Sequence, residues 1–516
     1  MVLIIETERI ADDGQLRLGG ASSVSATFID GRAFVVTNTI QDRTATLFNM
    51  SPDGTLTEIH RLQDASSRGM RGVSDSAFAV LEDGKTYLAI TSQDESALGY
   101  YEIRGAASIS HRSTFFDDVV LDPVDEVNNV RDGGDQATFW GASAVVTFEN
   151  NGRGFALVTG RNDAGLTLLE MNSGGKGAIL TTFFDTDETA LQGVEDLSIA
   201  EVGGARYFIT AAALERGLSV FQVTDENEIV NISNFQTKPE LPLARFTQLE
   251  TVTIGDNVFV LAGGFGARPL TVFQLSLNGE LSPLKQFRDA ETTNLTKLSA
   301  LKAFELEGLT YVAMGGDTGG ISLYRMKNNG TLNLVEQFGH DSPSRTNPTT
   351  DFDVITISGK TYLLATGQQN DGIATYRILG DPKGKLHQGD EGRDILKGGN
   401  KGDILIGEAG NDRLKGKSGK DLLLDGDGKD QLYGGAGRDV FEFTSDGLQD
   451  RIQDFQDGLD LIDISANVQN LADVTMAQVN ERVVRLDYDD EVLLIKGFAG
   501  GELSIADLSA DDFILG

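Results

Sequence analysis

Six consecutive nine-residue units fill residues 389–442 without an insertion or a deletion. The copies read GDEGRDILK, GGNKGDILI, GEAGNDRLK, GKSGKDLLL, DGDGKDQLY and GGAGRDVFE. Every copy has an aspartate at its sixth place, and these are Asp394, Asp403, Asp412, Asp421, Asp430 and Asp439. Every copy has a large apolar residue at its eighth place: Leu396, Leu405, Leu414, Leu423, Leu432 and Phe441. Few folds are compatible with so strict a period, so it constrains the chain more than any other feature.

The unit predicts a coil of short strands joined by glycine turns. Glycine permits positive φ angles, so the chain can bend tightly and turn its carbonyl oxygens inward. The aspartate adds a carboxylate, and the apolar residue two places later points the other way into a narrow core. Two units make one coil of a parallel β-roll, so each unit stacks on the second unit after it. Hard oxygen ligands in a flexible cage suit Ca²⁺.

This stacking predicts about four interior calcium sites. Each site lies between two aspartates: Asp394 with Asp412, Asp403 with Asp421, Asp412 with Asp430, and Asp421 with Asp439. The expected ligands also include turn glycines: Gly389, Gly392, Gly398, Gly407, Gly410, Gly416, Gly419 and Gly428. Sites on the turns that carry Lys401, Lys417 or Asp425 in place of glycine are expected to be weaker or missing. A flexible Gly/Asp linker is the alternative, but linkers do not keep an apolar register over six periods.

A longer repeat occupies the chain up to about residue 380. Seven similar segments, such as RAFVVTN, TYLAITS and TYLLATG, carry an aromatic residue near their start: Phe34, Tyr87, Phe155, Tyr207, Phe259, Tyr311 and Tyr362. The spacings between these aromatic residues are 53, 68, 52, 52, 52 and 51. Alternating apolar residues and Gly/Asn/Asp turns indicate four short strands in each unit. Seven such units predict a seven-bladed β-propeller.

The seventh unit lacks its last strand, whereas the N-terminus has an additional one, VLIIETERI. We therefore expect Val2–Ile10 to complete blade seven, because this leaves no sheet edge exposed. Pairing of this strand with another molecule is the alternative, and it would give a polymer. The 68-residue spacing contains an acidic insertion at residues 117–135, which is either a solvated loop or a further calcium site.

Composition excludes several classes of function. The formal net charge is −35, which disfavours nucleic acid and anionic membranes as partners. There is no cysteine, so stability must come from packing and metal rather than disulfides. No apolar run is long enough to span a membrane. The N-terminus lacks the basic region and cleavage site of a usual secretory signal, so an exported protein would need its signal elsewhere.

Evidence for catalysis is limited to acidic residues on the predicted inner strands. These are Asp75, Glu195, Asp196, Glu250, Asp351 and Asp353. A channel mouth lined by carboxylates could hold a metal and polarise a substrate, or it could be a hydrated channel without chemistry. No nucleophile elbow, zinc-protease motif, phosphate loop or cysteine is present. This favours a non-catalytic role, and no catalytic residue or organic cofactor site is assigned.

Two resemblances add to this interpretation. The nonapeptides, followed by DRIQDF and DLIDIS and by the terminal LSADDFILG, resemble secreted RTX proteins with a serralysin-like C-terminal region. That resemblance implies Ca²⁺ binding, type I secretion machinery as a partner and an extracellular or cell-surface location. Blade ends such as GISLYRMKNNGTLNLVEQF resemble lactonase-like propellers.

Together these features predict an all-β chain with four segments. They are a seven-bladed β-propeller (1–380), a linker (381–388), a parallel calcium β-roll (389–442), and a β cap with a type I secretion signal (443–516). Calcium modules outside cells bind weakly, with dissociation constants of about 10⁻⁴–10⁻³ M, so the roll is expected to fold after export. The propeller is expected to serve as a matrix, surface-layer or adhesion module with possible self-association. A secreted lactonase-like hydrolase is the alternative.

Overall fold

The protein is described from a computed structural model. The described residues are 3–11, 18–64, 70–81, 84–104, 108–116, 140–162, 164–172, 177–238, 241, 243–266, 269–287, 297–316, 320–338, 348–367, 372–380 and 383–516. The acidic insertion at 117–135 lies outside them, so its two interpretations stay predictions. No helix among these residues is long and apolar enough to cross a membrane.

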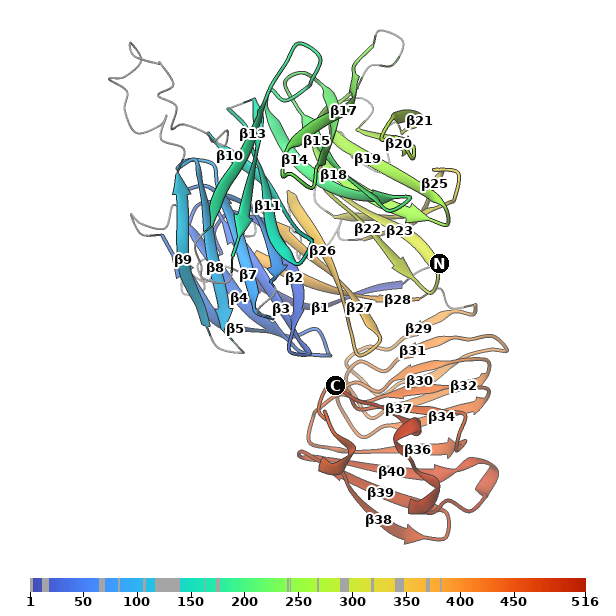
Figure 1. Ribbon diagram of the computed structural model, residues 1–516. Helices are drawn as coiled ribbons and strands as arrows, with labels where there is room; N and C mark the ends of the chain where they lie inside the picture. The colour runs from blue at the N-terminus through green and yellow to red at the C-terminus, as the bar shows by residue number, and fades with distance from the viewer. Residues whose placement is uncertain are drawn as a thin grey trace.

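Seven four-stranded antiparallel sheets surround a central channel, which confirms the predicted propeller (Figure 1). Blade one contains β2 (Ala21–Ile29), β3 (Arg32–Thr39), β4 (Thr44–Met50) and β5 (Leu56–Gln63). Blade two contains β6 (Val73–Val80), β7 (Thr86–Ser92), β8 (Ala97–Arg104) and β9 (Ser108–Phe116). Blade three contains β10 (Ala142–Asn150), β11 (Arg153–Gly160), β12 (Gly165–Met171) and β13 (Ala178–Phe184). Blade four contains β14 (Val194–Val202), β15 (Ala205–Ala212), β16 (Gly217–Val223) and β17 (Ile229–Gln236). Blade five contains β18 (Arg245–Ile254), β19 (Asn257–Phe265), β20 (Leu270–Leu275) and β21 (Leu281–Phe287). Blade six contains β22 (Leu298–Leu306), β23 (Leu309–Gly316), β24 (Ile321–Met326) and β25 (Leu332–Phe338).

Blade seven combines the two ends of the propeller sequence. It contains β26 (Thr349–Ile357), β27 (Lys360–Gly367) and β28 (Gly372–Leu379). The N-terminal strand β1 (Leu3–Ala11) forms its outer edge and pairs antiparallel with β28, so the blue and orange strands lie side by side in Figure 1. The repeated aromatic residues lie on the second strand of each blade and are at most 4% exposed. The 52-residue spacing therefore reports one buried packing position per blade.

Side-chain hydroxyls join neighbouring blades around the ring. Each inner strand has a register shift near its start, and six of the seven have Ser or Thr there. Each hydroxyl donates to a backbone carbonyl of the next blade, over 2.5 to 3.4 Å: Ser22 to Val73, Ser74 to Ala142, Ser143 to Val194, Thr247 to Leu298, Ser299 to Thr349 and Thr350 to Ala21. Blade four has Glu195 at this position, which forms an ion pair with Arg161 instead. These bonds satisfy buried backbone oxygens where strand pairing is interrupted.

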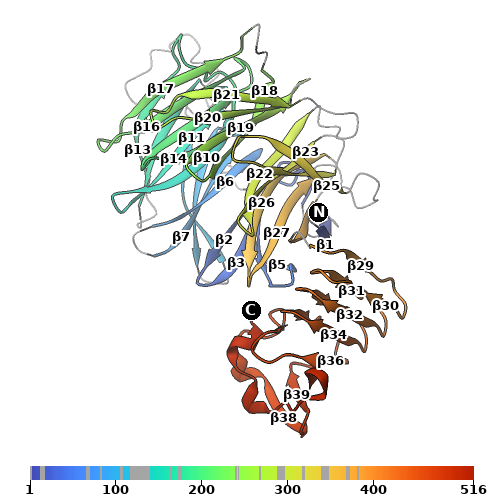
Figure 2. The same ribbon diagram turned by 90° about the vertical axis from the view of Figure 1, so that its right-hand side faces the viewer.

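The remaining chain forms a parallel β-roll and its cap, which confirms the predicted fold (Figure 2). One sheet contains β29 (Leu386–Gln388), β31 (Ile404–Ile406), β33 (Leu422–Leu424), β35 (Val440–Glu442), β37 (Leu461–Asp463) and β41 (Phe513–Ile514). The other contains β30 (Ile395–Lys397), β32 (Arg413–Ser418), β34 (Gln431–Ala436), β36 (Gln449–Phe455), β40 (Glu491–Gly497), β39 (Val483–Tyr488) and β38 (Thr475–Asn480). Short 3₁₀ helices in the cap are η3 (Leu471–Asp473), η4 (Phe498–Gly500), η5 (Ile505–Asp507) and η6 (Ala510–Asp512).

Each unit of the roll stacks on the second unit after it. Leu396 pairs with Leu414 and then Leu432, while Leu405 pairs with Leu423 and then Phe441. From the second copy on, the apolar side chains at the eighth place are fully buried. The stack begins with β29, inside the predicted linker at 381–388, and continues to β37, beyond the last nonapeptide. The solenoid therefore spans residues 386–463.

A buried ion-pair network joins the roll to blade seven. Glu442 of β35 contacts Arg377 of β28 and also Lys360 of β27, the latter over 3.0 Å. Lys360 lies 3.2 Å from Asp463 of β37 as well. Burial raises the pKa of Glu442, but the charges of Arg377 and Lys360 outweigh it and lower this pKa to about 2. An apolar contact of Leu379 with Ile404 and Ile406 lies beside this network.

Candidate metal centre

The six repeat aspartates form two ladders in the roll, one of Asp394, Asp412 and Asp430 and the other of Asp403, Asp421 and Asp439. The backbone N–H of each aspartate donates to Oδ1 of the aspartate one coil later: Asp394 to Asp412, Asp403 to Asp421, Asp412 to Asp430, and Asp421 to Asp439, over 2.6 to 2.9 Å. The structure thus brings together each pair that the sequence predicted. Oδ1 accepts this hydrogen bond and keeps a second lone pair, while Oδ2 takes no part in it.

In the interior of both ladders, Oδ2 has no hydrogen-bond partner among the described residues. The Oδ2 atoms of Asp412, Asp421, Asp430 and Asp439 are buried and accept no hydrogen bond in the described structure. In the first two copies Oδ2 accepts instead from the N–H groups of Asp390 and Gly399. A buried oxygen anion without a partner is costly, so each interior oxygen calls for a cation or a proton.

Backbone carbonyls complete an oxygen cradle beside Oδ2 of Asp412 and Oδ2 of Asp421. A Cβ added at Gly416 would lie 2.2 Å from Asp421 Oδ2 and 2.7 Å from the carbonyl oxygen of Gly434. A Cβ at Gly407 would lie 2.9 Å from Asp412 Oδ2 and 2.0 Å from the carbonyl oxygen of Asp425. Only glycine leaves this space open, and its lining of carboxylate and carbonyl oxygens fits Ca²⁺.

The predicted glycine ligands occupy two kinds of position. Those at the first place of a copy lie beside a ladder aspartate and a carbonyl of the next coil: Gly389, Gly398, Gly407 and Gly416. Those at the fourth place with φ between +142° and +146° lie where a Cβ would meet the backbone of the preceding coil: Gly410, Gly419 and Gly428. Gly392, in the first coil, donates its N–H to Asp390. The first-place glycines are thus the ones that open the cradles.

Burial and neighbouring carboxylates raise the pKa of four ladder aspartates: Asp412, Asp421, Asp430 and Asp439. Burial is the largest cause, followed among the raising effects by neighbouring carboxylates, and it brings the pKa of Asp421 to about 6 and those of Asp430 and Asp439 to about 7. Between about pH 4 and pH 7 the metal-free fold therefore holds protons that the unfolded chain has released. Stability of the metal-free roll is present at about pH 4 and is lost as pH rises through 7. A bound cation removes this penalty.

Both ladders extend one coil beyond the nonapeptides. Asp430 donates its N–H to Asp450, and Asp439 donates its N–H to Asp460, over 2.8 and 3.0 Å. These two aspartates were not among the ligands predicted from the sequence. Their signal is an aspartate two places before a buried isoleucine, in DRI and DLI, at a spacing lengthened by two or three residues.

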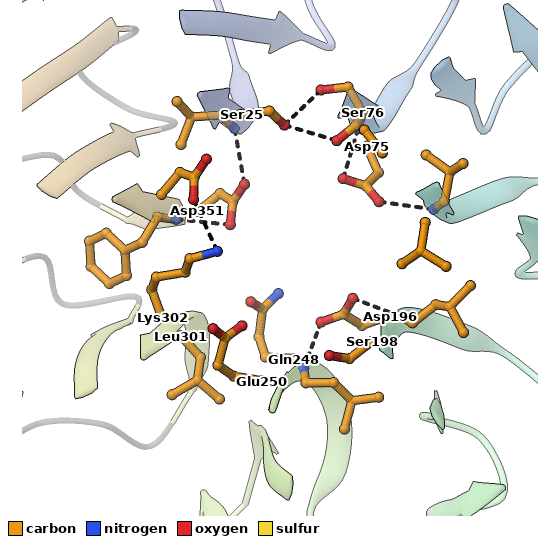
Figure 3. Close-up of a pocket in the computed structure, with 18 of the residues that line it drawn as sticks. Ser25, Asp75, Ser76, Asp196, Ser198, Gln248, Glu250, Leu301, Lys302 and Asp351 are labelled. Atoms are coloured by element: carbon orange, nitrogen blue, oxygen red, sulfur yellow. Dashed lines mark hydrogen bonds and ion pairs between the residues drawn. The ribbon is translucent and has the colours of Figure 1, made fainter. Parts of the chain in front are cut away.

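The channel of the propeller contains a second group of carboxylates (Figure 3). Five of the six predicted acidic residues line one cavity of about 340 Å³: Asp75, Asp196, Glu250, Asp351 and Asp353. Glu195 is not among its lining residues and pairs with Arg161. Burial raises the pKa of Asp75 to about 6 and that of Asp351 to about 8.

These channel carboxylates bind the backbone of the next blade. Asp75, Asp196 and Asp351 each accept from the N–H of the residue that follows them and from one N–H of the next blade, on Val145, Leu249 and Val24 respectively. Asp353 accepts from the N–H of Ala26 and lies 3.0 Å from Lys302 Nζ, and Glu250 accepts from the N–H of Ala303. Asp353 and Glu250 also raise the pKa of Lys302. The carboxylates that could polarise a substrate are therefore held in hydrogen bonds that connect neighbouring blades.

Residues 388–423 and 407–441 match the family model of the RTX calcium-binding nonapeptide repeat. The chain contains RTX calcium-binding repeats. These repeats imply that the roll binds Ca²⁺, in agreement with its oxygen cradles. No curated protein matches the chain.

Solved structures with similar folds are distant in sequence. A protein from Lactobacillus plantarum is 10% identical, with a TM-score of 0.44, over 61% of this chain and 84% of that one. A putative 6-phosphogluconolactonase from Bacteroides uniformis is also 10% identical, with a TM-score of 0.43, over 61% of this chain and 84% of that one.

Proposed function

We propose that this is an exported protein whose RTX roll folds on Ca²⁺ outside the cell and holds a propeller that binds or organises extracellular partners. The unpartnered, buried Oδ2 atoms of Asp412, Asp421, Asp430 and Asp439 carry this proposal. Ionising these four carboxylates in that interior without a counterion lowers the stability of the roll. In a cytosol low in calcium the sites stay unfilled, and binding outside supplies the energy of folding.

The ion-pair network gives a physical link between calcium and the propeller. β35 follows Asp439 directly and carries Glu442, so ordering the coil at Asp439 brings Glu442 to Arg377 and Lys360. Without the folded roll, both cations on blade seven lose their Glu442 partner. Calcium is therefore expected to dock the roll on the propeller as well as to fold it.

The C-terminal segment fits a role in type I secretion. It resembles the uncleaved signal of such substrates, and in the folded protein its Phe513–Ile514 strand, β41, pairs with β37 as the last strand of a roll sheet. An exporter would read this segment before folding, and the segment would then complete the roll. We propose that the propeller acts as a matrix, surface-layer or adhesion module, since its channel carboxylates are held by inter-blade bonds.

Two measurements on the full chain test the proposal. Far-ultraviolet circular dichroism should show β signal that increases on addition of Ca²⁺ and is lost with chelator. Light scattering at high protein concentration should show self-association that requires Ca²⁺. Full β content in excess chelator contradicts calcium-dependent folding. A monomer at high concentration with Ca²⁺ removes the support for a self-assembling matrix role.

A further inference from the structure

The fifth repeat carries an aspartate where the other copies have a glycine. Asp425 occupies the first place of DGDGKDQLY. In copies one to four and in copy six, a Cβ at that first place would lie within 3 Å of Oδ2 of the ladder aspartate five residues later. A side chain at the first place is therefore directed into the cradle of its own copy. The Asp425 carboxylate enters the cradle of Asp430.

The geometry around Asp425 agrees with this direction. Oxygen atoms of Asp425, Asp430 and Asp450 all lie within 4.8 Å of one another, and all three residues are buried. Asp425 Oδ1 accepts from the N–H groups of Gly426 and Thr444, while Asp425 Oδ2 and Asp430 Oδ2 have no hydrogen-bond partner among the residues that the structure describes. Asp425 is 0% exposed, so solvent does not reach the unpartnered oxygen.

We infer that Asp425, Asp430 and Asp450 form a three-carboxylate calcium site that binds more tightly than the other sites of the roll. Oxygens bound to one Ca²⁺ lie about 2.3–2.6 Å from it, so they are at most roughly 5 Å apart, which the cluster satisfies. Affinity of calcium sites rises with the number of charged ligands. The cradles of Asp412 and Asp421 each have one such carboxylate beside a carbonyl oxygen.

The surroundings of the site favour a cation and connect it to the cap. Asp450 also belongs to a second acidic group with Asp446 and Glu491, the first residue of β40. No Lys, Arg or His forms an ion pair with any of these five carboxylates among the described residues. Both oxygens of Asp446 accept backbone N–H groups, from Gly428 and Leu448, and Asp446 adds negative potential beside Asp450. A cation at Asp450 would therefore stabilise the boundary between roll and cap.

Asp425 also contributes an oxygen atom to the cradle of the neighbouring coil. Its carbonyl oxygen lines the cradle of Asp412, while its side chain enters that of Asp430. The sequence predicts a weaker site at this copy because a glycine is missing. The structure points to a stronger site, because the aspartate that stands in place of glycine adds a charged ligand. Its backbone carbonyl still lines the cradle of Asp412.

Calcium titration of the full chain by calorimetry, with a competing chelator, tests the inference. Asp425→Gly restores the repeat residue, and Asp425→Asn keeps the size of the side chain. Both are expected to weaken the tightest binding step by at least about tenfold, since one charged ligand is removed. Asp427→Asn is the matched control, because Asp427 is an exposed aspartate in the same turn, and it should change that step less than twofold. Unchanged affinity in both Asp425 variants overturns the inference.

Diffraction from the unmodified chain provides a test that does not depend on a variant folding. Crystals grown with Ca²⁺ and soaked with Tb³⁺ should give an anomalous peak within coordination distance of Asp425, Asp430 and Asp450. Peaks at other ladder positions without one here would show that these carboxylates share protons instead, and would overturn the inference alone. The inference rests on the proposed function in that both need calcium in the roll, and absence of every peak would contradict both.

Discussion

Replacing one ladder carboxylate by its amide should have opposite effects with and without calcium. In Asp421→Asn, the amide oxygen can still accept the hydrogen bond from the N–H of Asp403, which spans 2.7 Å. The amide nitrogen takes the place of the unpartnered Oδ2 and can donate toward the carbonyl oxygen of Gly434. The variant thus removes a buried negative charge and creates a hydrogen bond, but it removes a charged calcium ligand.

The two effects are of similar size. The pKa of Asp421 is raised by burial from 3.8 to about 6. At about 1.4 kcal/mol per pKa unit, the ionised carboxylate costs the calcium-free fold up to ~3 kcal/mol at pH 7. Neighbouring carboxylates share this cost, so we expect the amide to stabilise the calcium-free roll by ~1–2 kcal/mol. In about 10 mM Ca²⁺, loss of a site with a dissociation constant of about 10⁻⁴–10⁻³ M removes ~1.4–2.7 kcal/mol.

Circular dichroism of the full chain measures both changes. In chelator, Asp421→Asn should increase the far-ultraviolet β signal of the roll, and in calcium it should lower the urea midpoint of the roll transition. Asp490→Asn, at an exposed turn of the cap, is the charge-matched control and should leave both readouts nearly unchanged. A variant that loses β signal in chelator and is also destabilised in calcium would refute the reasoning, because the carboxylate would then be a structural hydrogen-bond acceptor only.

Three further changes test other parts of the structure. Ser74→Ala leaves the carbonyl of Ala142 without its 2.7 Å hydrogen bond and should lower propeller stability by ~1–2 kcal/mol in thermal unfolding; an unchanged melting temperature would exclude a role for the hydroxyl ring. Glu442→Gln leaves Arg377 and Lys360 buried with less compensation and should cost ~3–5 kcal/mol, separating roll and propeller transitions in calorimetry; a single unshifted transition would contradict the coupling. Calcium-free roll stability should fall as pH rises from about 4 to 7, because the ladder carboxylates must release protons; stability that rises over this range would contradict the raised pKa values.

The sequence predicted the fold well because its repeats report buried positions. Tyr362 and the six equivalent aromatic residues identify seven blades, and Asp394 to Asp439 identify the coil of the roll. Asp450 and Asp460 were missed because two or three extra residues interrupt the period before each of them. Contacts between segments distant in sequence, such as Glu442 with Arg377, have no local pattern and could be seen only in the structure.

Part of the candidate sites could likewise be predicted from the sequence, and part could not. The repeat period alone placed the ladder aspartates, because each hydrogen bond joins two aspartates that are eighteen residues apart. Period could not show that Asp75 and Asp351 use both oxygens to hold backbone N–H groups, because that depends on the neighbouring blade. It also could not show which carboxylate oxygen stays without a partner, because this depends on atomic positions in the adjacent coil.

Hydrogen exchange of the full chain, measured by mass spectrometry, tests calcium-dependent folding most directly. Backbone amides of residues 386–463 should be protected in Ca²⁺ and exchange freely in excess chelator, while the propeller amides stay protected in both. Protection of the roll in excess chelator, equal to that in calcium, would contradict the account, because the roll would then fold without its cation.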